Sequence, residues 1–447
     1  MFSMAVAERI LQYDGAAIQF DDQCMSYSEL QHIMRLTAGY LDSYNKPLKV
    51  AFTLANERLY VPLFLGCVLQ GARPFLLHPE HPYNDQLLQQ IKPDIMIEDG
   101  EAFLAKVQQM GEIYEVRAIR EDKEELFTGF TSGTTGIPKG YRRSEASWLA
   151  SFTMNDEVFQ LQDVDLFIAG GPLYHSLTLF AAVSALYAGK EIRLMSSFQA
   201  GRMISGTEQT AIFGVPSMLE LMTEHTTDAP LIFLSSGAKL ESHTLHKAAE
   251  QFPNMTVYEY FGSSEASYIS YLTPEDRKRF PASAGRFFPD VTYRLIDEEL
   301  VVSSPYIFTG YFGQQDNKGM IATGDIADVE EGMLYLKGRR NNRLIVGGRN
   351  VYPEEVESII QRELDVHEVL VTGKRHYLLG EVAVAIVHPR GNFDRQFADL
   401  TIRKQLEKYK WPLKWIVDTN FLYTDSGKIA RFAMQERYGL NEYSLHR

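Results

Sequence analysis

Residues 130–140 read FTSGTTGIPKG, and they follow an apolar run, Leu126–Phe130, that is typical of a β-strand. The stretch combines three kinds of group that a polyphosphate needs: glycines that let the backbone come close, hydroxyl donors, and the cationic Lys139. An ordinary surface turn requires neither a lysine nor paired threonines. We therefore predict that this loop binds phosphate at the end of a strand.

The spacing within the loop differs from that of a Walker A motif. Walker A has a longer interval between its glycines and places Ser or Thr after its lysine. Here only two residues separate Gly133 from Gly136, and Gly140 follows Lys139. A kinase or GTPase of the P-loop type is therefore disfavoured.

On both sides of the loop, short β-rich runs alternate with longer helical patterns. The runs lie at Val50–Leu54, Pro74–Leu77, Asp94–Ile97, Leu166–Ala169, Glu191–Met195, Ala211–Val215, Leu231–Leu234 and Thr256–Tyr260. Such alternation is typical of an α/β protein whose largely parallel sheets are covered by helices. Ligands of these sheets bind where the carboxyl ends of the strands and their loops cluster, so motifs that follow the runs are well placed to bind a ligand.

The pattern changes near Asp290 to short β segments with frequent turns, which predicts a small β unit that closes the large domain. After Gly338 a separate pattern begins. It contains a helix near Pro353–Glu363, strands near Glu368–Thr372 and Glu381–Val387, and a helix near Phe397–Tyr409. We predict an N-terminal domain over residues 1–340 and a smaller C-terminal α+β domain over residues 341–447.

Composition narrows the possible partners. The chain has 447 residues and a net charge of −14, so it would repel a nucleic-acid backbone. Its two cysteines, Cys24 and Cys67, are too few for a disulfide framework and too far apart for a CxxC motif, which favours the cytoplasm. The apolar stretch Ala169–Gly189 includes Pro172 and His175, so we expect a buried loop and helix and no membrane span.

The loop Thr131–Gly140 resembles the signature loop of the adenylate-forming superfamily, which includes acyl-CoA and aryl-CoA synthetases, nonribosomal adenylation domains and firefly-type luciferases. The likeness extends from Met25–Leu30 to Ser426–Arg431, with the motifs in the family's order. It implies an ATP- and acid-binding domain joined by a hinge to a mobile small domain, with ATP, Mg²⁺ and CoA bound. Within the loop it implies phosphate contacts from Thr131, Ser132, Gly133, Thr134, Thr135, Gly136 and Lys139.

Further motifs of the resemblance concern the nucleotide. Tyr260–Glu265 resembles the aromatic-Gly-x-Thr-Glu element, in which an aromatic residue stacks on adenine, a hydroxyl touches the α-phosphate and the Glu holds Mg²⁺. Ser236–Leu240 resembles the turn that lines the adenine pocket, and Asp325 and Arg339 stand where the family contacts the ribose. The nucleotide contacts implied in these motifs are Tyr260, Phe261, Gly262, Ser264, Glu265, Gly237, Ala238, Lys239, Asp325 and Arg339. The other interpretation of Glu265 is a solvated loop carboxylate, and taken singly Gly324–Asp325 is as likely to be a plain turn.

The C-terminal part of the resemblance concerns the second half of the reaction. Lys428 falls at the family's lysine that reaches the reacting carboxylate, although a lysine in such a loop would otherwise be a solvated cation. Gly348 would lie beside the tunnel for pantetheine. Asn341 stands at the hinge, where Asp or Lys is more usual, and Ile345 stands where many relatives carry a polar residue or a lysine.

The segment Gly171–His175 resembles an element at the edge of the acyl pocket of acyl-CoA and aryl-CoA synthetases. His175 takes the position where amino acid adenylation domains usually have an aspartate that pairs with the substrate ammonium, and a histidine supplies no such fixed anion. The resemblance therefore implies a fatty, short acyl or aryl acid. The other interpretation of His175 is a hydrogen-bonded core histidine.

The resemblance implies that a carboxylic acid is activated as an acyl adenylate and then joined to CoA, with Lys428, Lys139, Glu265 and His175 as the catalytic set. No general base is required, because an acid of pKa about 4.3 is already ionised at neutral pH. One alternative acceptor is the phosphopantetheine of a carrier protein. A second alternative is an inactive nucleotide-binding regulator, which Asn341, Ile345 and the lack of the family's histidine in Tyr141–Glu145 motivate.

Overall fold

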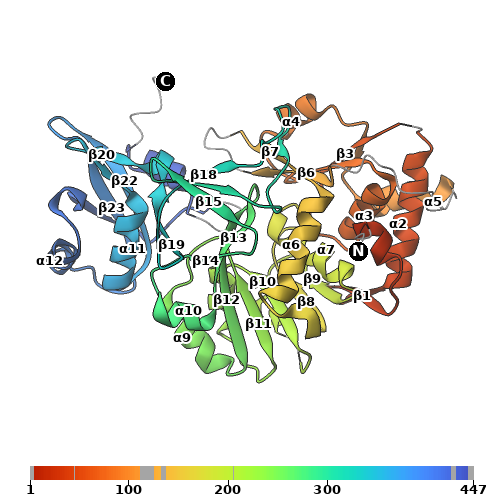
Figure 1. Cartoon of the computed structure of the whole chain (residues 1–447), viewed down its shortest axis with the longest axis horizontal. Coiled ribbons are helices and arrows are strands. Elements are labelled where there is room, and N and C mark those ends of the chain that lie inside the picture. Colours follow the sequence, from red (N-terminus) through yellow and green to blue (C-terminus); the bar gives the residue numbers. More distant parts are fainter. Residues whose placement is uncertain are drawn as a thin grey trace. The chain divides into compact units, whose positions relative to one another are not determined.

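The computed structural model describes residues 5–44, 46–110, 125–131, 137–204, 206–423 and 429–440. Helices and strands alternate along the chain, which confirms the α/β class (Figure 1). The chain forms two compact units, Met1–Thr292 with Val302–Ile321 and Tyr293–Val301 with Ala322–Arg447. The chain first passes between the units at Thr292, close to the change of pattern near Asp290. The domain boundary at Asn341 stays a prediction.

One sheet of the first unit has the strand order β14-β13-β12-β11-β10-β8-β9-β1-β2. Neighbouring strands are parallel from β12 to β1, whereas β2, β13 and β14 pair antiparallel. Every residue of β8 and β10 is buried, as expected for parallel strands that are covered on both faces. The strands are β1 (Ala16–Phe20), β2 (Gln23–Ser26), β8 (Leu166–Ala169), β9 (Glu191–Leu194), β10 (Thr210–Gly214), β11 (Leu231–Ser235), β12 (Met255–Ser263), β13 (Ser267–Leu272) and β14 (Gly285–Phe287).

A second sheet of the first unit has the order β17-β7-β6-β4-β3-β5. Its strands are β3 (Lys49–Phe52), β4 (Arg73–Leu76), β5 (Ile95–Ile97), β6 (Phe127–Thr131), β7 (Lys139–Arg143) and β17 (Gly310–Tyr311). The pairs among β3, β4, β5 and β6 are parallel, whereas β7 pairs antiparallel with both β6 and β17. The antiparallel hairpin β6–β7 therefore flanks the predicted phosphate loop.

Helices connect and cover these strands. The helices of the first unit are α1 (Val6–Ile10), α2 (Tyr27–Asp42), α3 (Tyr60–Gln70), α4 (Asn84–Ile91), α5 (Gly100–Met110), α6 (Glu145–Glu157), α7 (Ser176–Tyr187), α8 (Pro216–Met222), α9 (Ser242–Gln251) and α10 (Pro274–Arg279). Helix α7 is apolar on most sides and lies beside β8 and β9, with residues Thr178 to Leu186 buried, as predicted (Figure 1). Across the described ranges, no helix combines the length and the apolar character that crossing a bilayer requires.

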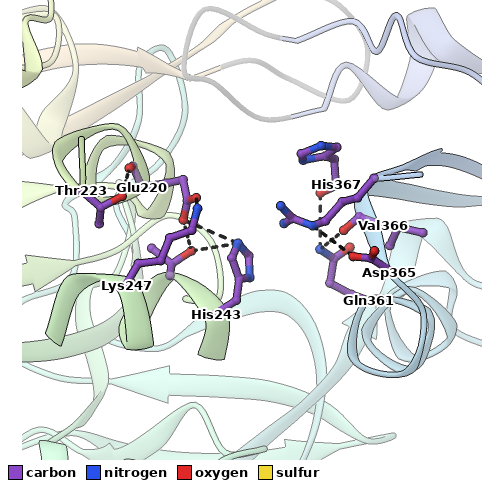
Figure 2. A network of polar contacts seen from close by, with 10 residues as sticks. Glu220, Thr223, His243, Lys247, Gln361, Asp365, Val366 and His367 are labelled. Carbon is purple, nitrogen blue, oxygen red and sulfur yellow. Dashed lines mark hydrogen bonds and ion pairs between the residues drawn. The ribbon is translucent and has the colours of Figure 1, made fainter. Parts of the chain in front are cut away.

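Glu220 ties α8 to α9. Its carboxylate accepts a hydrogen bond from the Thr244 hydroxyl at 2.7 Å and forms an ion pair with Lys247, and His243 lies 3.5 Å from the same carboxylate (Figure 2). Burial would raise the pKa of Glu220, but the hydrogen bonds from Lys247 and Thr244 outweigh it and lower this pKa. The network therefore fastens the two helices at the surface of the first unit.

The second unit contains a β ribbon and an α+β sheet. The ribbon has the order β15-β16-β18-β19, and the sheet has the order β21-β20-β23-β22 with β24 paired to β23. The strands are β15 (Thr292–Ile296), β16 (Glu299–Ser303), β18 (Ile321–Glu330), β19 (Met333–Arg339), β20 (Leu344–Val346), β21 (Arg349–Val351), β22 (Val366–His376), β23 (Gly380–Pro389) and β24 (Lys414–Val417), and the helices are α11 (Pro353–Glu363), α12 (Arg395–Gln405) and α13 (Arg431–Arg437). Gln361 of α11 donates to the Val366 carbonyl at 3.4 Å, which links the helix to β22 (Figure 2).

The predicted bounds in this unit are wrong for two elements. The strand expected near Glu368–Thr372 is longer and runs over Val366–His376. The helix expected over Phe397–Tyr409 ends at Gln405, because Leu406 adopts an extended backbone and is buried. Residues Lys408–Lys410 then form a separate 3-10 turn. Leu406 is spaced from the apolar residues of α12 as a further helical residue would be. It packs into the same core, but from a non-helical backbone, so the spacing predicted too long a helix.

Helices α2 and α3 approach each other closely at Gly66, and this contact can be tested. A Cβ at Gly66 would lie 2.5 Å from the Thr37 Cβ and 3.0 Å from the Met34 carbonyl oxygen. Alanine normally favours a helix over glycine by about 1 kcal/mol. Overpacking should outweigh this gain, so we expect Gly66→Ala to lower the free energy of unfolding by about 1–3 kcal/mol. Urea denaturation monitored by circular dichroism measures this change in the free energy of unfolding.

Gly201→Ala provides the control, because its Cβ would lie 3.5 Å from the His225 ring, an ordinary contact. This variant should unfold at the urea concentration of the parent chain. A Gly66→Ala variant as stable as the parent would contradict the close packing of α2 on α3.

Candidate active site

The sequence motifs lie at the carboxyl ends of neighbouring parallel strands in the first unit. β8 is followed by Gly171–His175, β11 is followed by Ser236–Leu240, and β12 ends within Tyr260–Glu265. The register places Ser235, the last residue of β11, opposite Gly214, the last residue of β10. Because these strand ends are level, the loops that follow them share one edge of the sheet, where α/β proteins bind ligands.

The hairpin β6–β7 fixes both ends of the predicted phosphate loop. Thr131, the last residue of β6, is the register partner of Lys139, the first residue of β7. Gly129 permits this pairing, because a Cβ there would lie 2.3 Å from the hydroxyl oxygen of Tyr141 on β7. The other predicted phosphate contacts, Ser132, Gly133, Thr134, Thr135 and Gly136, lie outside the described residues.

Tyr311 of β17 links Lys139 to Glu265. The Nζ of the exposed Lys139 lies 5.7 Å from the centroid of the Tyr311 ring, within the range of a cation–π interaction. The Tyr311 hydroxyl donates a hydrogen bond to Oε1 of Glu265 at 3.1 Å. Burial and the Glu265 carboxylate raise the pKa of Tyr311, so it remains a donor at neutral pH. The structure thus brings two predicted site residues onto one tyrosine that the sequence motifs do not indicate.

Hydrogen bonds hold the main chain of Glu265 in place, and its side chain is suited to bind a metal ion. Its N–H donates to Oγ of Ser263 at 3.2 Å, and its carbonyl accepts from the N–H of Phe308 at 2.7 Å. The side chain is half-buried, and Tyr311 is its hydrogen-bond partner in the described part of the chain. A carboxylate oxygen suits Mg²⁺. The described residues contain no cluster of three or more His, Cys, Asp or Glu for a metal, so the remaining ligands would be nucleotide oxygens or water.

The two aromatic residues of the same motif have different surroundings. Tyr260 is buried, and its ring contacts Tyr268 edge-on at 5.0 Å, while burial raises its pKa. Phe261 is half-buried, and in a strand its side chain points to the opposite face from that of Tyr260. Gly262 is required by the backbone, because a Cβ there would lie 1.8 Å from the Ser267 carbonyl oxygen. Of the pair, Phe261 is therefore the better placed to meet a ligand.

The turn after β11 is exposed at the same edge of the sheet. Gly237 has φ +87°, and Gly237, Ala238 and Lys239 are all exposed. The buried carboxylate of Glu259 accepts the Leu240 N–H at 2.8 Å and pairs with Arg277, which holds the end of this turn on β12. Burial raises the pKa of Glu259 although the Arg277 charge opposes this.

The loop with His175 is held by Asn56, a residue that no motif indicates. The Asn56 amide donates to the Gly171 carbonyl at 2.9 Å and its oxygen accepts the Leu173 N–H at 2.7 Å. His175 is half-buried at the N-cap of α7, with its ring edge-on to Tyr174 at 4.7 Å. The histidine is therefore neither a fully buried core residue nor a free surface group.

In the second unit, the buried Asp325 forms an ion pair with the exposed Arg339 on the adjacent strand. They are register partners in β18 and β19, and Nε of Arg339 lies 3.0 Å from Oδ1 of Asp325. The same arginine donates to the Thr323 carbonyl at 2.9 Å. Burial raises the pKa of Asp325 to about 6, and the Arg339 charge limits this rise. The two residues predicted to contact ribose are thus adjacent.

The remaining predictions concern the second unit alone. Gly348 is exposed with φ +79°, and the exposed Ile345 donates its N–H to Glu381 at 2.7 Å. Asn341 is exposed in the 3-10 turn Arg340–Asn342. Lys428 lies outside the described residues.

Comparisons with known sequences agree with these motifs. A family model described as AMP-binding enzyme matches residues 8–312. The chain is 32% identical to VraA of Staphylococcus haemolyticus (strain JCSC1435), provisionally named a long chain fatty acid-CoA ligase, over 96% of both chains. It is 29% identical to the uncharacterized acyl-CoA ligase YhfT of Bacillus subtilis (strain 168), over 93% of both chains.

Solved structures share the two-domain fold. The o-succinylbenzoate CoA synthetase MenE of Bacillus subtilis, in complex with the acyl-adenylate intermediate OSB-AMP, is similar with a TM-score of 0.83 at 22% identity, over 97% of this chain and 98% of that one. ATP-bound MatB from Rhodopseudomonas palustris is similar with a TM-score of 0.85 at 22% identity, over 97% of this chain and 99% of that one.

The link between Tyr311 and Glu265 can be measured by a double-mutant cycle. Tyr311→Phe keeps the ring but removes the donor, and Glu265→Gln removes the charge of the acceptor. A hydrogen bond to a charged group contributes about 1.5–3 kcal/mol, less where water reaches the acceptor, so we expect a coupling energy of about 1 kcal/mol. Urea unfolding of the four proteins gives this coupling. Additive effects of the two substitutions would contradict the contact.

Proposed function

Because this chain belongs to the AMP-binding enzyme family, within the adenylate-forming superfamily, we propose that it is an AMP-forming acid–thiol ligase. It joins a carboxylic acid to ATP as an acyl adenylate and then transfers the acyl group to CoA. The observation that carries the proposal is the convergence of Lys139 and Glu265 on Tyr311, beside the hairpin that bounds the phosphate loop. A cation and an acidic metal ligand side by side suit a polyphosphate.

In the first half-reaction, a carboxylate oxygen forms a bond to the α-phosphorus of ATP, and the bond from this phosphorus to the bridging oxygen breaks as pyrophosphate leaves. Both reactants are anions, so the protein must position them and neutralise charge. Lys139 faces the departing phosphates, and Glu265 holds the metal. A bound Mg²⁺ supplies charge neutralisation on the phosphate oxygens. The acid is already ionised, so the chain needs no general base.

Each unit carries residues at positions where the family contacts the nucleoside. Phe261 and the exposed turn Gly237–Lys239 contact the adenine, and Ser264 contacts the α-phosphate. The Asp325 carboxylate accepts hydrogen bonds from the ribose hydroxyls, while Arg339 keeps this carboxylate oriented through their ion pair. These roles rest on the resemblance of the motifs and, for the turn Gly237–Lys239, on its exposure after β11.

The acid binds beside His175, and we expect a fatty, short acyl or aryl acid. No fixed anion stands at this position to pair with an α-ammonium group, and the provisional name of VraA supports a fatty acid. In the second half-reaction the thiol sulfur attacks the acyl carbon and AMP leaves. Gly348 lies at the thiol path, and Lys428 acts in the adenylation step alone.

Release of AMP tests this proposal. The protein is incubated with ATP, Mg²⁺, CoA and a set of fatty, short acyl and aryl acids, and AMP and acyl-CoA are quantified by chromatography. We expect both products with at least one acid class. Lys139→Met should reduce the rate by about 10²-fold, because it removes a positive charge that stabilises the transition state. Lys106→Met is the matched control, since Lys106 also lies over a tyrosine ring, at 5.3 Å from that of Tyr40, and belongs to no motif.

The outcome with different acceptors separates the alternatives. AMP formed with a holo carrier protein but not with CoA would assign the acyl group to phosphopantetheine. Binding of ATP without AMP release from any acid or acceptor would overturn the ligase and favour a nucleotide-binding regulator.

The raised pKa of Asp325 predicts how nucleoside binding depends on pH. The carboxylate is charged above a pH of about 6 and becomes protonated below it, so its capacity to accept two ribose hydroxyls is lost as the pH falls. We expect the affinity for adenosine, which has no phosphate to titrate, to decrease below pH 6. Asp325→Asn should bind weakly at every pH, without this step. Isothermal titration calorimetry measures both affinities.

Asp328→Asn is the control, because Asp328 lies on the same strand but pairs with Lys337 at 2.8 Å and belongs to no motif. Its binding should follow the pH profile of the parent chain. A step near pH 6 that persists in Asp325→Asn would assign the titration to another group.

A further inference from the structure

Arg143, the last residue of β7, is a buried cation without a carboxylate partner. Its side chain has no exposed surface, and no ion pair to it occurs among the described residues. Its Nε is buried and has no hydrogen-bond partner there either. Burial lowers the pKa of Arg143 to about 10, so the guanidinium is still charged at neutral pH. Burying an uncompensated charge costs free energy, so the presence of an arginine at this position needs an explanation.

The guanidinium binds the main chain on both sides of the proposed metal ligand. Nη2 donates to the Ser264 carbonyl at 2.8 Å, one residue before Glu265, and Nη1 donates to the Tyr306 carbonyl. The segment that carries Tyr306 also supplies the Phe308 N–H, which donates to the Glu265 carbonyl at 2.7 Å. Arg143 therefore clamps two segments, 264–265 and 306–308, that contact each other at Glu265.

Tyr141 lies on the same face of β7 and reinforces this clamp. Residues two apart in a strand point to the same side, so Tyr141 and Arg143 both face inward. The Ser264 side chain lies near the Tyr141 hydroxyl, and burial keeps this tyrosine protonated by raising its pKa to about 12. Both inward side chains of β7 thus lie close to Ser264, which is in the turn between β12 and β13.

Glu145 is not the missing counter-ion of Arg143. Its Oε1 accepts the Val6 N–H at 2.8 Å, at the first residue of α1, where a carboxylate is favoured. Glu145 stands near the position of the family's histidine, so this departure from the family pattern has a structural role. The Arg143 charge consequently acts on Glu265, whose carboxylate stabilises it from a distance.

The sign of the electrostatic effect separates two explanations of Arg143. A buried cation behind Glu265 repels a divalent metal, so a purely electrostatic role would make metal binding weaker. A positioning role would make metal binding stronger, because it holds the carboxylate in one place before the metal arrives. Removing the charge should therefore change metal affinity in opposite directions under the two explanations.

We propose that Arg143 is a positioning residue, which fixes the Glu265 carboxylate for the metal–nucleotide complex by clamping the main chain at Ser264 and Tyr306. The inference rests on the proposed function in one respect, because it takes Glu265 as the metal ligand. Arg143 touches no substrate and acts through Glu265 alone.

The experiment measures the coupling between metal and nucleotide in the full chain, without acid and hence without turnover. ATP affinity is determined by calorimetry with and without Mn²⁺, and bound Mn²⁺ is counted by electron paramagnetic resonance. The variants are Arg143→Met, which removes the charge and both donors, and Arg143→Lys, which keeps the charge but cannot span both carbonyls. Arg73→Met is the control, since Arg73 lies in the same sheet, on β4, and within the described ranges its side chain pairs at the surface with Glu125 at 3.8 Å.

We expect Arg143→Met to reduce the Mn²⁺ enhancement of ATP affinity by about tenfold or more, as substitutions behind a metal ligand do. Its affinity for ATP without metal should fall by less than this factor, because Ser264, which contacts the α-phosphate, is held by the same clamp. Arg143→Lys should lose less, and Arg73→Met should lose nothing. If Arg143→Met does not fold, the same comparison is made with Arg143→Lys, which keeps the buried charge and should still show a reduced enhancement.

Three outcomes would overturn the proposal. Unchanged or stronger Mn²⁺ coupling in Arg143→Met would leave no positioning role. A parallel loss of ATP affinity with and without metal would make Arg143 a purely structural residue. The third outcome concerns Glu265→Gln, and it identifies the failing premise. If this variant keeps full Mn²⁺ coupling, Glu265 is not the metal ligand and the proposed site itself fails.

Discussion

The antiparallel register of β6 with β7 is the constraint on which the candidate site of the first unit depends. It places Thr131 opposite Lys139, so both ends of the phosphate loop are fixed before any ligand binds. The same register points Tyr141 and Arg143 inward and pairs β7 with β17, which carries Tyr311. A slip of one residue would turn every side chain of β7 to the other face. The phosphate loop and the buried clamp therefore both depend on β7, and Tyr311, which contacts the proposed metal ligand, lies on the strand beside it.

Positively charged side chains lie at the proposed site, although the net charge of the chain is negative. The chain carries −14 overall, yet its proposed substrates are anions. Lys139 and Lys239 stand exposed at or after the ends of strands. Arg142, on the face of β7 opposite to Lys139, is neutralised by Glu125 at 2.7 Å and Asp316 at 2.6 Å. Local cations in a site, rather than net charge, set the field that a bound anion experiences. An acidic surface and a phosphate site are thus compatible.

Much of the fold follows from short-range patterns. The apolar runs of the parallel sheets predict β4, β5, β8, β9, β10 and β11 to within one residue at each end, because strands buried on both faces are continuously apolar. They also locate β3 and β12, with errors of two and three residues at the carboxyl ends. The helix Pro353–Glu363 is also correct at both ends. The error at Gln405 arises where Leu406 keeps the apolar spacing of a helix but packs into the core from an extended backbone. Spacing alone cannot distinguish these two ways of burying a leucine.

By itself, the sequence determined the alternation of strands and helices, the order of the motifs and their positions after strands, because each of these depends on residues that are close together in the chain. Only the tertiary structure decided which groups meet. Tyr311 reaches Glu265 across 46 residues, Arg143 reaches Ser264 across 121, and Asn56 reaches Gly171 across 115. None of the three contacts leaves a local pattern, since a hydrogen bond to a distant carbonyl or carboxylate places no requirement on neighbouring residues.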